Sequence, residues 1–221
     1  MTAHHIPDSM LLDHAAGTLP VAVDILVTTH LSLCPHCRRE LAMMEEAAGA
    51  MLDSIAPVAG DDEAGLARLL GILDDPLPPP TAPAAPFANS PSEDLLPAPL
   101  RQVVGPSSAL TWRTSMPGVA RRSELNFGLG DVAATLEEVR PGKTVPSHGH
   151  EGIELTMVLA GGYSDKQGHF LRGDVQVVGP ETIHAPLIDD EGVPCILLSI
   201  RSAARVPDGL AAHIASWLGA I

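Results

Sequence analysis

The sequence predicts an α+β protein with two domains, a small helical N-terminal domain and an all-β C-terminal domain that forms a jelly-roll-like barrel. Apolar residues recur at helical spacing before residue 75, whereas short apolar runs separated by glycine and proline turns follow residue 100. A proline-rich stretch separates the two patterns. We therefore expect domains at residues 1–75 and 100–221, joined by a linker at residues 76–99.

Four helical segments are expected in the N-terminal domain. The first spans residues 8–17 and ends at a glycine, and the second runs from a proline at residue 20 to about residue 30. The third begins at residue 34 or 35, and a fourth covers residues 61–73. The third is marked by apolar residues three or four positions apart, which are Leu41, Met44, Ala48, Met51 and Ile55.

After the expected helices the sequence pattern changes, first to a proline-rich stretch and then to short apolar runs. Nine prolines between residues 76 and 99 exclude a helix or a central strand there and predict extended or irregular chain. Residues 208–218 are expected to form a short amphipathic helix at the end of the β-domain. The expected strands, each bounded by glycine or proline turns, are residues 123–127, 132–139, 153–159, 175–178 and 195–200.

Composition limits the classes of function. Thirteen Lys and Arg against 27 Asp and Glu give a net charge of −14, so direct binding to a nucleic-acid backbone is not expected. Three cysteines, an odd number, predict a reducing compartment and no disulfide framework. Neither a signal peptide nor a long apolar run is visible, and we therefore expect a cytoplasmic protein without a membrane span.

The first candidate metal site is an HxxxCxxC motif formed by His30, Cys34 and Cys37. A helix end, a tight turn and the start of the next helix bring these three side chains to one point, and the helix N-terminus favours the thiolates. Two thiolates and one imidazole are ligands that zinc prefers in structural sites, which need a fourth ligand. The residues that remain open for this position are His4, His5, His14 and His36.

Two other interpretations of the CxxC pair were weighed. A thioredoxin-like redox pair would lie beside a βαβ pattern, and no such pattern surrounds Cys34 and Cys37. The two residues could also be buried structural cysteines without a metal. The histidine four positions before Cys34 favours a zinc site over both.

The second candidate metal site is formed by His148, His150, Glu154 and His184. Residues two apart in a strand point to the same side, so His148 and His150 share a face that Glu154 joins if the strand continues. His184 has to come from another strand. Three imidazoles and a carboxylate suit zinc, manganese, iron or nickel and usually leave the metal open to a small ligand.

Residues 142–161 resemble the first motif of the cupin family, in which a glycine is followed by HxH, a glutamate and a second glycine. The matching positions are Gly142, His148, His150, Glu154 and Gly161. The second motif is a weaker match, because Gly173 and His184 follow it but residues 179–181 replace its PxG turn and Ile188 its asparagine. The resemblance implies a cupin barrel with a second divalent metal, expected to be zinc.

The HxxxCxxC motif, with a histidine 25 residues before it, resembles the zinc-binding anti-sigma domain of bacteria. The ligands implied by that family are His5, His30, Cys34 and Cys37, and the adjacent His4 stays open. A helical zinc domain followed by a cupin domain resembles the ChrR-type anti-sigma factors. The resemblance implies a protein that is not an enzyme but inhibits an extracytoplasmic-function (group IV) sigma factor and releases it under oxidative stress such as singlet oxygen, sensed through the cupin domain.

Three further expectations follow from the residues. Met43 and Met44 on the third helix are candidate partner-binding residues, with an intramolecular core as the alternative. Cys195 is expected to be a buried strand residue, with redox sensing as the alternative. The chain as a whole is alternatively a metal-dependent, oxygenase-like cupin enzyme with a helical assembly domain, or a zinc-dependent scaffold for another kind of protein.

Overall fold

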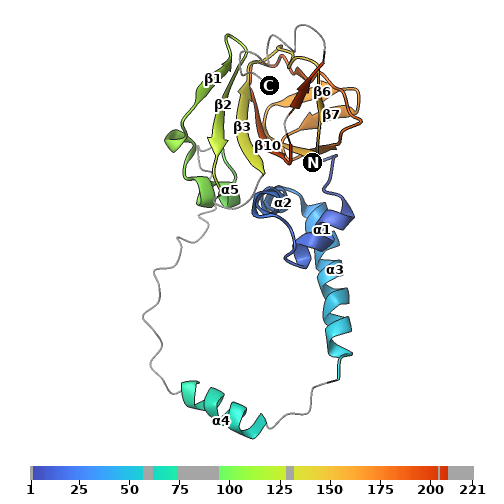
Figure 1. The fold of residues 1–221 in the computed structure, drawn as a ribbon, viewed down its shortest axis with the longest axis vertical. Helices are drawn as coiled ribbons and strands as arrows, with labels where there is room; N and C mark the ends of the chain where they lie inside the picture. Colours follow the sequence, from blue (N-terminus) through green and yellow to red (C-terminus); the bar gives the residue numbers. More distant parts are fainter. Residues whose placement is uncertain (1, 57–61, 74–94, 128–131, 204, 209–221) are drawn as a thin grey trace. The chain divides into compact units, whose positions relative to one another are not determined.

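A computed structural model of the chain describes residues 2–56, 62–73, 95–127, 132–203 and 205–208 (Figure 1). The chain divides into two compact units, residues 1–44 with 93–221 and residues 45–92. This division differs from the expected boundaries, because the first helices pack on the β-sheet within one unit. The expected two-domain boundaries stay a prediction, and most of the expected linker, residues 76–99, lies outside the described residues.

The four expected helices are present, and the described residues include a fifth. Gly17 ends the first helix with a φ of 67°, and Pro20 precedes the second. The fifth helix follows Pro97, where sequence predicted extended chain, because proline is tolerated in a first helical turn. None of the described helices is long and apolar enough to span a membrane. The helices are α1 (Asp8–Ala15), α2 (Val21–Leu33), α3 (Pro35–Asp53), α4 (Asp62–Leu73) and α5 (Ala98–Val104).

The β-domain is built from antiparallel strands in three sheets. A six-stranded sheet has the order β1-β2-β3-β10-β5-β8, a three-stranded sheet the order β7-β6-β9, and β11 pairs with β4. The strands are β1 (Arg113–Met116), β2 (Ala120–Leu125), β3 (Ala133–Val139), β4 (His148–His150), β5 (Glu154–Ala160), β6 (Gly162–Asp165), β7 (Gly168–Leu171), β8 (Val175–Val178), β9 (Leu187–Ile188), β10 (Cys195–Arg201) and β11 (Arg205–Pro207).

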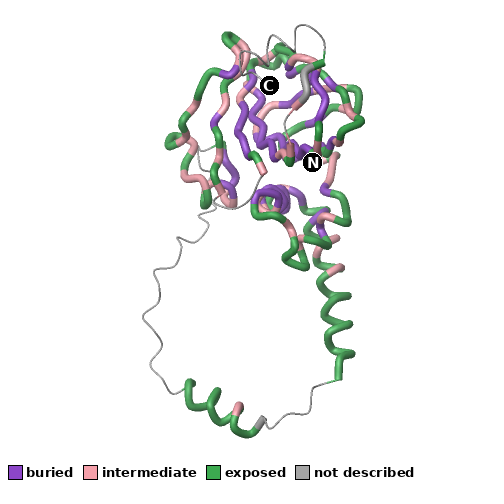
Figure 2. The backbone as a smooth tube through the Cα atoms, viewed as in Figure 1, coloured by how far each residue is buried: buried purple, intermediate pink, exposed green. Residues whose placement is uncertain are grey.

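One face of the six-stranded sheet is covered by helices of the same unit. Ile196, Leu198 and Ile200 of β10 are buried in a core that extends to the helices. Leu26 and Val27 of α2 are fully buried in that core, and α2 contacts β5, β10 and α5. The N-terminal helices therefore use the sheet as part of their own hydrophobic core (Figure 2).

The other face of the sheet points into the barrel. Cys195 and Leu197, which alternate with the residues above, pack in a second core with Tyr163, Phe170 and Ile188 of the small sheet. The same inner face carries polar side chains, because Ser199 of β10 lies opposite Thr135 on one side and Thr156 on the other. Each of the five expected strands is confirmed, with ends that differ by a few residues from those expected.

Three other expectations had different outcomes. The remaining strands contain two to four residues, which is too short to show a periodicity, and the HxH strand among them was expected from its motif. The expected helix at residues 208–218 lies outside the described residues apart from its first position. Cys195 is fully buried, and burial raises the pKa of its thiol to about 12, as expected for a core residue rather than a reactive one.

Candidate metal centres

The first centre lies where α2 meets α3. His5, His30, Cys34 and Cys37 each offer a ligand atom, and these four atoms lie within 4.8 Å of one another. His30 is in the last turn of α2, Cys34 caps that helix, and Cys37 is in the first turn of α3. His5 lies before α1, among the first residues of the chain, and is the least buried of the four. We call this group the thiolate centre.

Distances inside the thiolate centre suit a tetrahedral metal. His30 Nε2 lies 3.2 Å from Cys37 Sγ, and His5 Nδ1 lies 3.4 Å from Cys34 Sγ. Ligand atoms around a tetrahedral zinc with ordinary bond lengths are roughly 3.5 Å apart. The donor set therefore fits a cation that prefers sulfur and nitrogen.

The two thiols differ in their acidity. Burial alone would raise the pKa of Cys34, but hydrogen bonds donated by the Cys37 N–H (3.4 Å) and the Thr2 hydroxyl (3.0 Å) outweigh burial and lower it. Burial raises the pKa of Cys37 to about 11, and the neighbouring Cys34 adds to the effect. Both cysteines would bind a metal as thiolates, and the charge of a bound cation favours their deprotonated form.

The structure separates the four histidines that sequence left open. His5 joins the thiolate centre, whereas His4 Nε2 is 3.1 Å from the carbonyl oxygen of His169 and its ring lies against Phe170. His14 pairs with Asp24 at 2.6 Å. His36, inside the CxxC turn, is outside the group of four ligand atoms.

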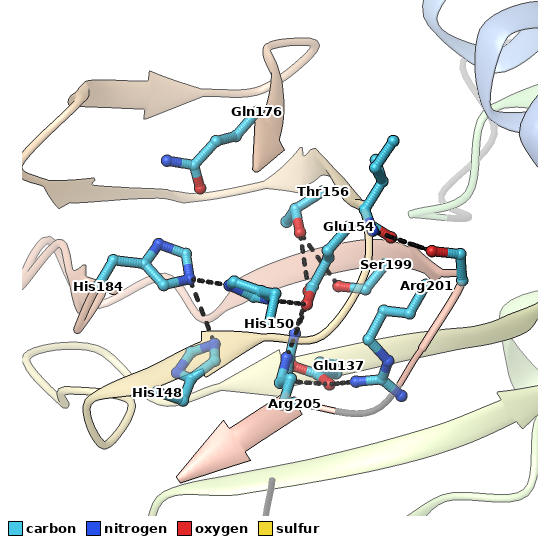
Figure 3. A network of polar contacts seen from close by, with 12 residues as sticks. Glu137, His148, His150, Glu154, Thr156, Gln176, His184, Ser199, Arg201 and Arg205 are labelled. Atoms are coloured by element: carbon cyan, nitrogen blue, oxygen red, sulfur yellow. Dashed lines mark hydrogen bonds and ion pairs between the residues drawn. The ribbon is translucent and has the colours of Figure 1, made fainter. Parts of the chain in front are cut away.

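The second centre lies inside the barrel, on β4 and the loop that precedes β9 (Figure 3). His184 Nε2 lies 3.2 Å from both His148 Nε2 and His150 Nε2, and all three rings are buried. A bridge between the backbones of His148 and His184 holds the two segments together. We call this group the histidine centre.

The opposite nitrogen of each ring has a hydrogen-bond acceptor. His148 Nδ1 is 2.8 Å from the Pro146 carbonyl oxygen, and His184 Nδ1 is 2.9 Å from Asp165 Oδ2. His150 Nδ1 is 3.1 Å from Glu154 Oε2. When each Nδ1–H donates to its acceptor, the three Nε2 lone pairs point at a common centre, which is the arrangement of histidine ligands in metal sites.

Burial favours the neutral form of two of these rings. It lowers the pKa of His148 to about 3, with a further contribution from the positive charge of Arg205. Burial also lowers the pKa of His184, against the opposing effect of Asp165. Neutral imidazoles are the form that binds a metal, so the histidine centre is ready for a cation at neutral pH.

Glu154 does not join the three converging nitrogen atoms. Its carboxylate contacts His150 and forms a two-point ion pair with Arg205, which donates from Nε at 3.0 Å and from a second, shorter contact through Nη2. Burial would raise the pKa of Glu154, but the Arg205 charge outweighs it and holds the pKa well below its usual value. In this geometry Glu154 contacts the predicted ligand His150, and its own role as a metal ligand stays a prediction.

Arg205 was missed in the sequence, and so was its second partner. Its Nη1 donates to Glu137 Oε1 at 2.9 Å, and Arg201 lies 3.6 Å from the same oxygen. No motif marks Arg205, because it reaches Glu137 and Glu154 only once β11 pairs with β4. Asp165 was missed for a similar reason, since the β6–β7 hairpin brings it to His184.

A small cavity of about 20 Å³ adjoins the histidine centre. It is lined by His148 and His184 together with Tyr163 and Gln176. The Tyr163 hydroxyl donates to Gln176 Oε1 at 2.8 Å, so the lining polar groups are paired. A space of this size holds about one water molecule or one ion.

The two candidate partner-binding methionines differ in exposure. Met43 is 55% exposed, whereas Met44 is partly buried and packs against the core that the helices share with the sheet. Met43 therefore offers its side chain to solvent, and much of Met44 is used internally.

The fold and the two sites define a class of proteins in which a helical region with a His/Cys cluster is combined with a cupin barrel that contains a buried histidine cluster. Residues 100–201 match the family model described as the ChrR cupin-like domain. The chain is 37% identical over 203 residues to the anti-sigma-E factor ChrR of Cereibacter sphaeroides, and this alignment covers 90% of each chain.

A solved structure of Rhodobacter sphaeroides SigE in complex with the anti-sigma factor ChrR is also similar. The match has a TM-score of 0.73 and 35% identity, and it covers 91% of this chain and 99% of that one. The chain belongs to the ChrR family of anti-sigma factors.

Proposed function

We propose that this protein is a cytoplasmic anti-sigma factor that binds and inhibits an extracytoplasmic-function (group IV) sigma factor and releases it under oxidative stress such as singlet oxygen. The observation that carries the proposal is the similarity, over 90% of both chains, to an anti-sigma factor of the same two-part build. The net charge of −14 is consistent with a protein partner and disfavours direct contact with DNA.

Zinc is the cation proposed for the thiolate centre, held by His5, His30, Cys34 and Cys37. Two sulfur and two nitrogen donors fill its tetrahedral shell, so the ion would connect the N-terminal segment to α2 and α3 without leaving a position for chemistry. Zinc binding contributes on the order of 10 kcal/mol to folding in small zinc modules. Loss of the ion would therefore loosen the helices that bind the partner.

The histidine centre is proposed as the sensing site, with a second divalent cation, expected to be zinc, held by His148, His150 and His184. Glu154 and Asp165 would orient two of these ligands, and the small cavity adjoins His148 and His184. A cation in such a site supplies Lewis acidity to a small bound molecule.

The size of the cavity favours a regulator over the alternative enzyme. Pockets for organic ligands usually measure about 300–1,000 Å³, whereas the cavity at the histidine centre measures about 20 Å³. The described residues thus leave room there for a water-sized or diatomic molecule but not for an organic substrate. An oxygenase acting on an organic molecule would need a much larger opening.

The proposed sigma-binding surface lies on α4 and on the second half of α3. Leu66, Leu70 and Leu73 of α4 are more than half exposed and lie on one helix face. Met51 and Leu52 of α3 are exposed to a similar extent. Apolar helix faces of this kind are typical of helices that dock in a partner's groove.

Co-expression with a candidate sigma factor, followed by purification and metal analysis, tests the proposal. We expect a stable complex with zinc bound. Replacing Cys34 with Ala should remove this zinc and weaken the complex by at least about tenfold, because zinc binding is part of the folding free energy. His36→Gln is the matched control, since it lies between the cysteines but outside the thiolate centre. Full inhibition by zinc-free Cys34→Ala protein would refute the structural role of the ion.

A second experiment separates sensing from binding. His148→Ala should leave inhibition of the sigma factor intact in unstressed cells but reduce the release of the sigma factor by singlet oxygen. The exposed His169→Gln should respond as the wild type does. Turnover of a small molecule that His148→Ala abolishes, in a protein without affinity for any sigma factor, would support the enzyme instead.

A further inference from the structure

The thiolate centre is held in part by the β-domain. Residues 2–5, which we call the N-terminal segment, end in the ligand His5 and run along the turn between β7 and β8. Ala3 N–H and His4 N–H donate to the same oxygen, Asp174 Oδ1, at 2.7 and 3.1 Å. The Val175 N–H donates to the His4 carbonyl oxygen at 3.2 Å. The backbone on the N-terminal side of His5 is therefore fixed by Asp174 and by Val175, the first residue of β8.

The same turn reaches a second ligand of the thiolate centre. His30 Nδ1 donates to the Gly173 carbonyl oxygen at 2.8 Å, which turns its Nε2 toward Cys37. Gly173 has a φ of 96°, and a Cβ atom there would lie 2.6 Å from Thr2 Cγ2. The turn accordingly needs glycine both for its backbone conformation and for the close approach of the N-terminal segment.

The carboxylate of Asp174 accepts hydrogen bonds from several backbone N–H groups around the turn. It is only 2% exposed, and its second oxygen, Oδ2, accepts the Leu171 N–H at 2.9 Å. Two N–H groups from the N-terminal segment and one from the turn thus converge on a single buried carboxylate. Hydrogen bonds to a charged acceptor are among the stronger ones, so Asp174 fixes the N-terminal segment firmly to β8.

The opposite end of this arrangement leads to the histidine centre. Gln176, two residues after Asp174 on β8, donates from Nε2 to Asp165 Oδ2 at 2.7 Å. Asp165 Oδ2 is also 2.9 Å from Nδ1 of His184, a residue of the histidine centre. Strand β8 therefore contacts the supporting residues of both centres.

We propose that Asp174 is a positioning residue for the metal of the thiolate centre, and that it couples that centre to the histidine centre through β8. The inference rests on the proposed function in one respect, the presence of a cation at the thiolate centre. A change in the position of His184 would move Asp165 and Gln176, shift β8 and loosen the hold of Asp174 on the segment that carries His5.

Cobalt substitution gives a signal from the thiolate centre alone, because only a cobalt ion bound by cysteine shows thiolate-to-cobalt charge-transfer absorption. The full-length protein is loaded with cobalt, and loss of this absorption is followed in excess chelator. Asp174→Asn should release cobalt about tenfold to a hundredfold faster, as outer-shell substitutions do. Asp190→Asn, the same change at an exposed carboxylate, should match the wild type. Equal rates for the two variants would overturn the proposal.

A second pair of variants avoids any change in the barrel itself. Ala3→Pro removes the N–H that donates to Asp174, whereas Ala3→Ser keeps it. Ala3→Pro should speed cobalt loss and Ala3→Ser should not, and equal rates would again contradict the inference. Wild-type protein that shows no thiolate-to-cobalt absorption would instead refute the proposed zinc site, so the two failures are distinguishable.

A double-mutant cycle tests the coupling between centres. His184→Ala should accelerate cobalt loss from the thiolate centre in the wild-type background, and the acceleration should shrink or vanish when Asp174 is already Asn. Rates that multiply independently, or no effect of His184→Ala, would show that β8 does not connect the two centres.

Discussion

At the scale of single residues, the two centres differ in what orients their ligands. In the histidine centre every ring has an acceptor at Nδ1, and two of the acceptors are carboxylates. One of these, Glu154, is balanced by Arg205, which is buried between Glu154 and Glu137. The orientation of the ligands thus depends on a buried group of charges that lies behind them.

Arg205 should be important for stability. Arg205→Met removes the arginine paired with the buried Glu154 and leaves Glu137 with the more distant Arg201. We expect it to lower the free energy of unfolding by roughly 3–5 kcal/mol. Arg121→Met, which breaks an ion pair with Glu138 in which the arginine is half exposed, should cost less than about 1 kcal/mol. Urea unfolding of both variants measures the difference, and similar losses would contradict this account.

Acid should destabilise the metal-free protein. His148 has a pKa of about 3 in the folded state, and burial lowers the pKa values of His30 and His184 as well. Below pH 6.5 the unfolded chain binds protons that the folded chain does not. The free energy of unfolding therefore decreases as the pH is lowered, by up to about 1.4 kcal/mol per pH unit for each histidine. Urea unfolding in chelator at pH 7.5, 6.5 and 5.5 measures this slope. His148→Gln should reduce it, and an unchanged midpoint across this range would contradict the prediction.

At the scale of elements, sequence predicted what is periodic or carries a motif. The four expected helices and five expected strands showed their period or their turns, and spacing identified His30, Cys34 and Cys37 of one centre and His148 and His150 of the other. His5 and His184 were predicted from the family resemblances. Strand β11 was not predicted, and the role of Arg205, which lies on it, was therefore missed. The choice between His4 and His5 could not be made from spacing, because it depends on Phe170 and the β7–β8 turn, which are distant in sequence.

The apolar face of α4 should contribute to sigma binding. Leu66→Ser with Leu70→Ser removes two exposed apolar side chains from the face of α4 that we propose as a docking surface, and should weaken the complex by at least about tenfold without changing the fold. Arg68→Ser, on the opposite side of the helix, is the control. Titration calorimetry with the sigma factor gives the affinities, and equal values would place the binding surface elsewhere.

The methionines of α3 give a separate test. Met43→Ala should weaken sigma binding, because the side chain is exposed, whereas Met44→Ala should mainly lower stability, because the side chain packs on the core. Pull-down affinities and thermal unfolding of the two single variants distinguish these effects. Unchanged affinity for the Met43 variant would show that Met43 does not bind the sigma factor.

At the scale of the whole molecule, residues 1–44 and the β-domain share one core. A specific protease site inserted after Ile55 should therefore give two fragments that stay together, because Leu26 and Val27 remain buried against β10 and its neighbours. Gel filtration after cleavage checks this, and separation of the fragments without denaturant would show that the helices are an independent body.

The shared core also affects how the chain is made. The helices of residues 1–44 are synthesised about 150 residues before β10, which at about 5–20 residues per second leaves them without their sheet for roughly 10–30 s. During that interval the core around α2 is incomplete because β10 is missing, but the thiolate centre is complete in sequence once Cys37 has emerged. A bound metal ion would then be the first tertiary contact to protect a nascent chain whose hydrophobic partner does not yet exist.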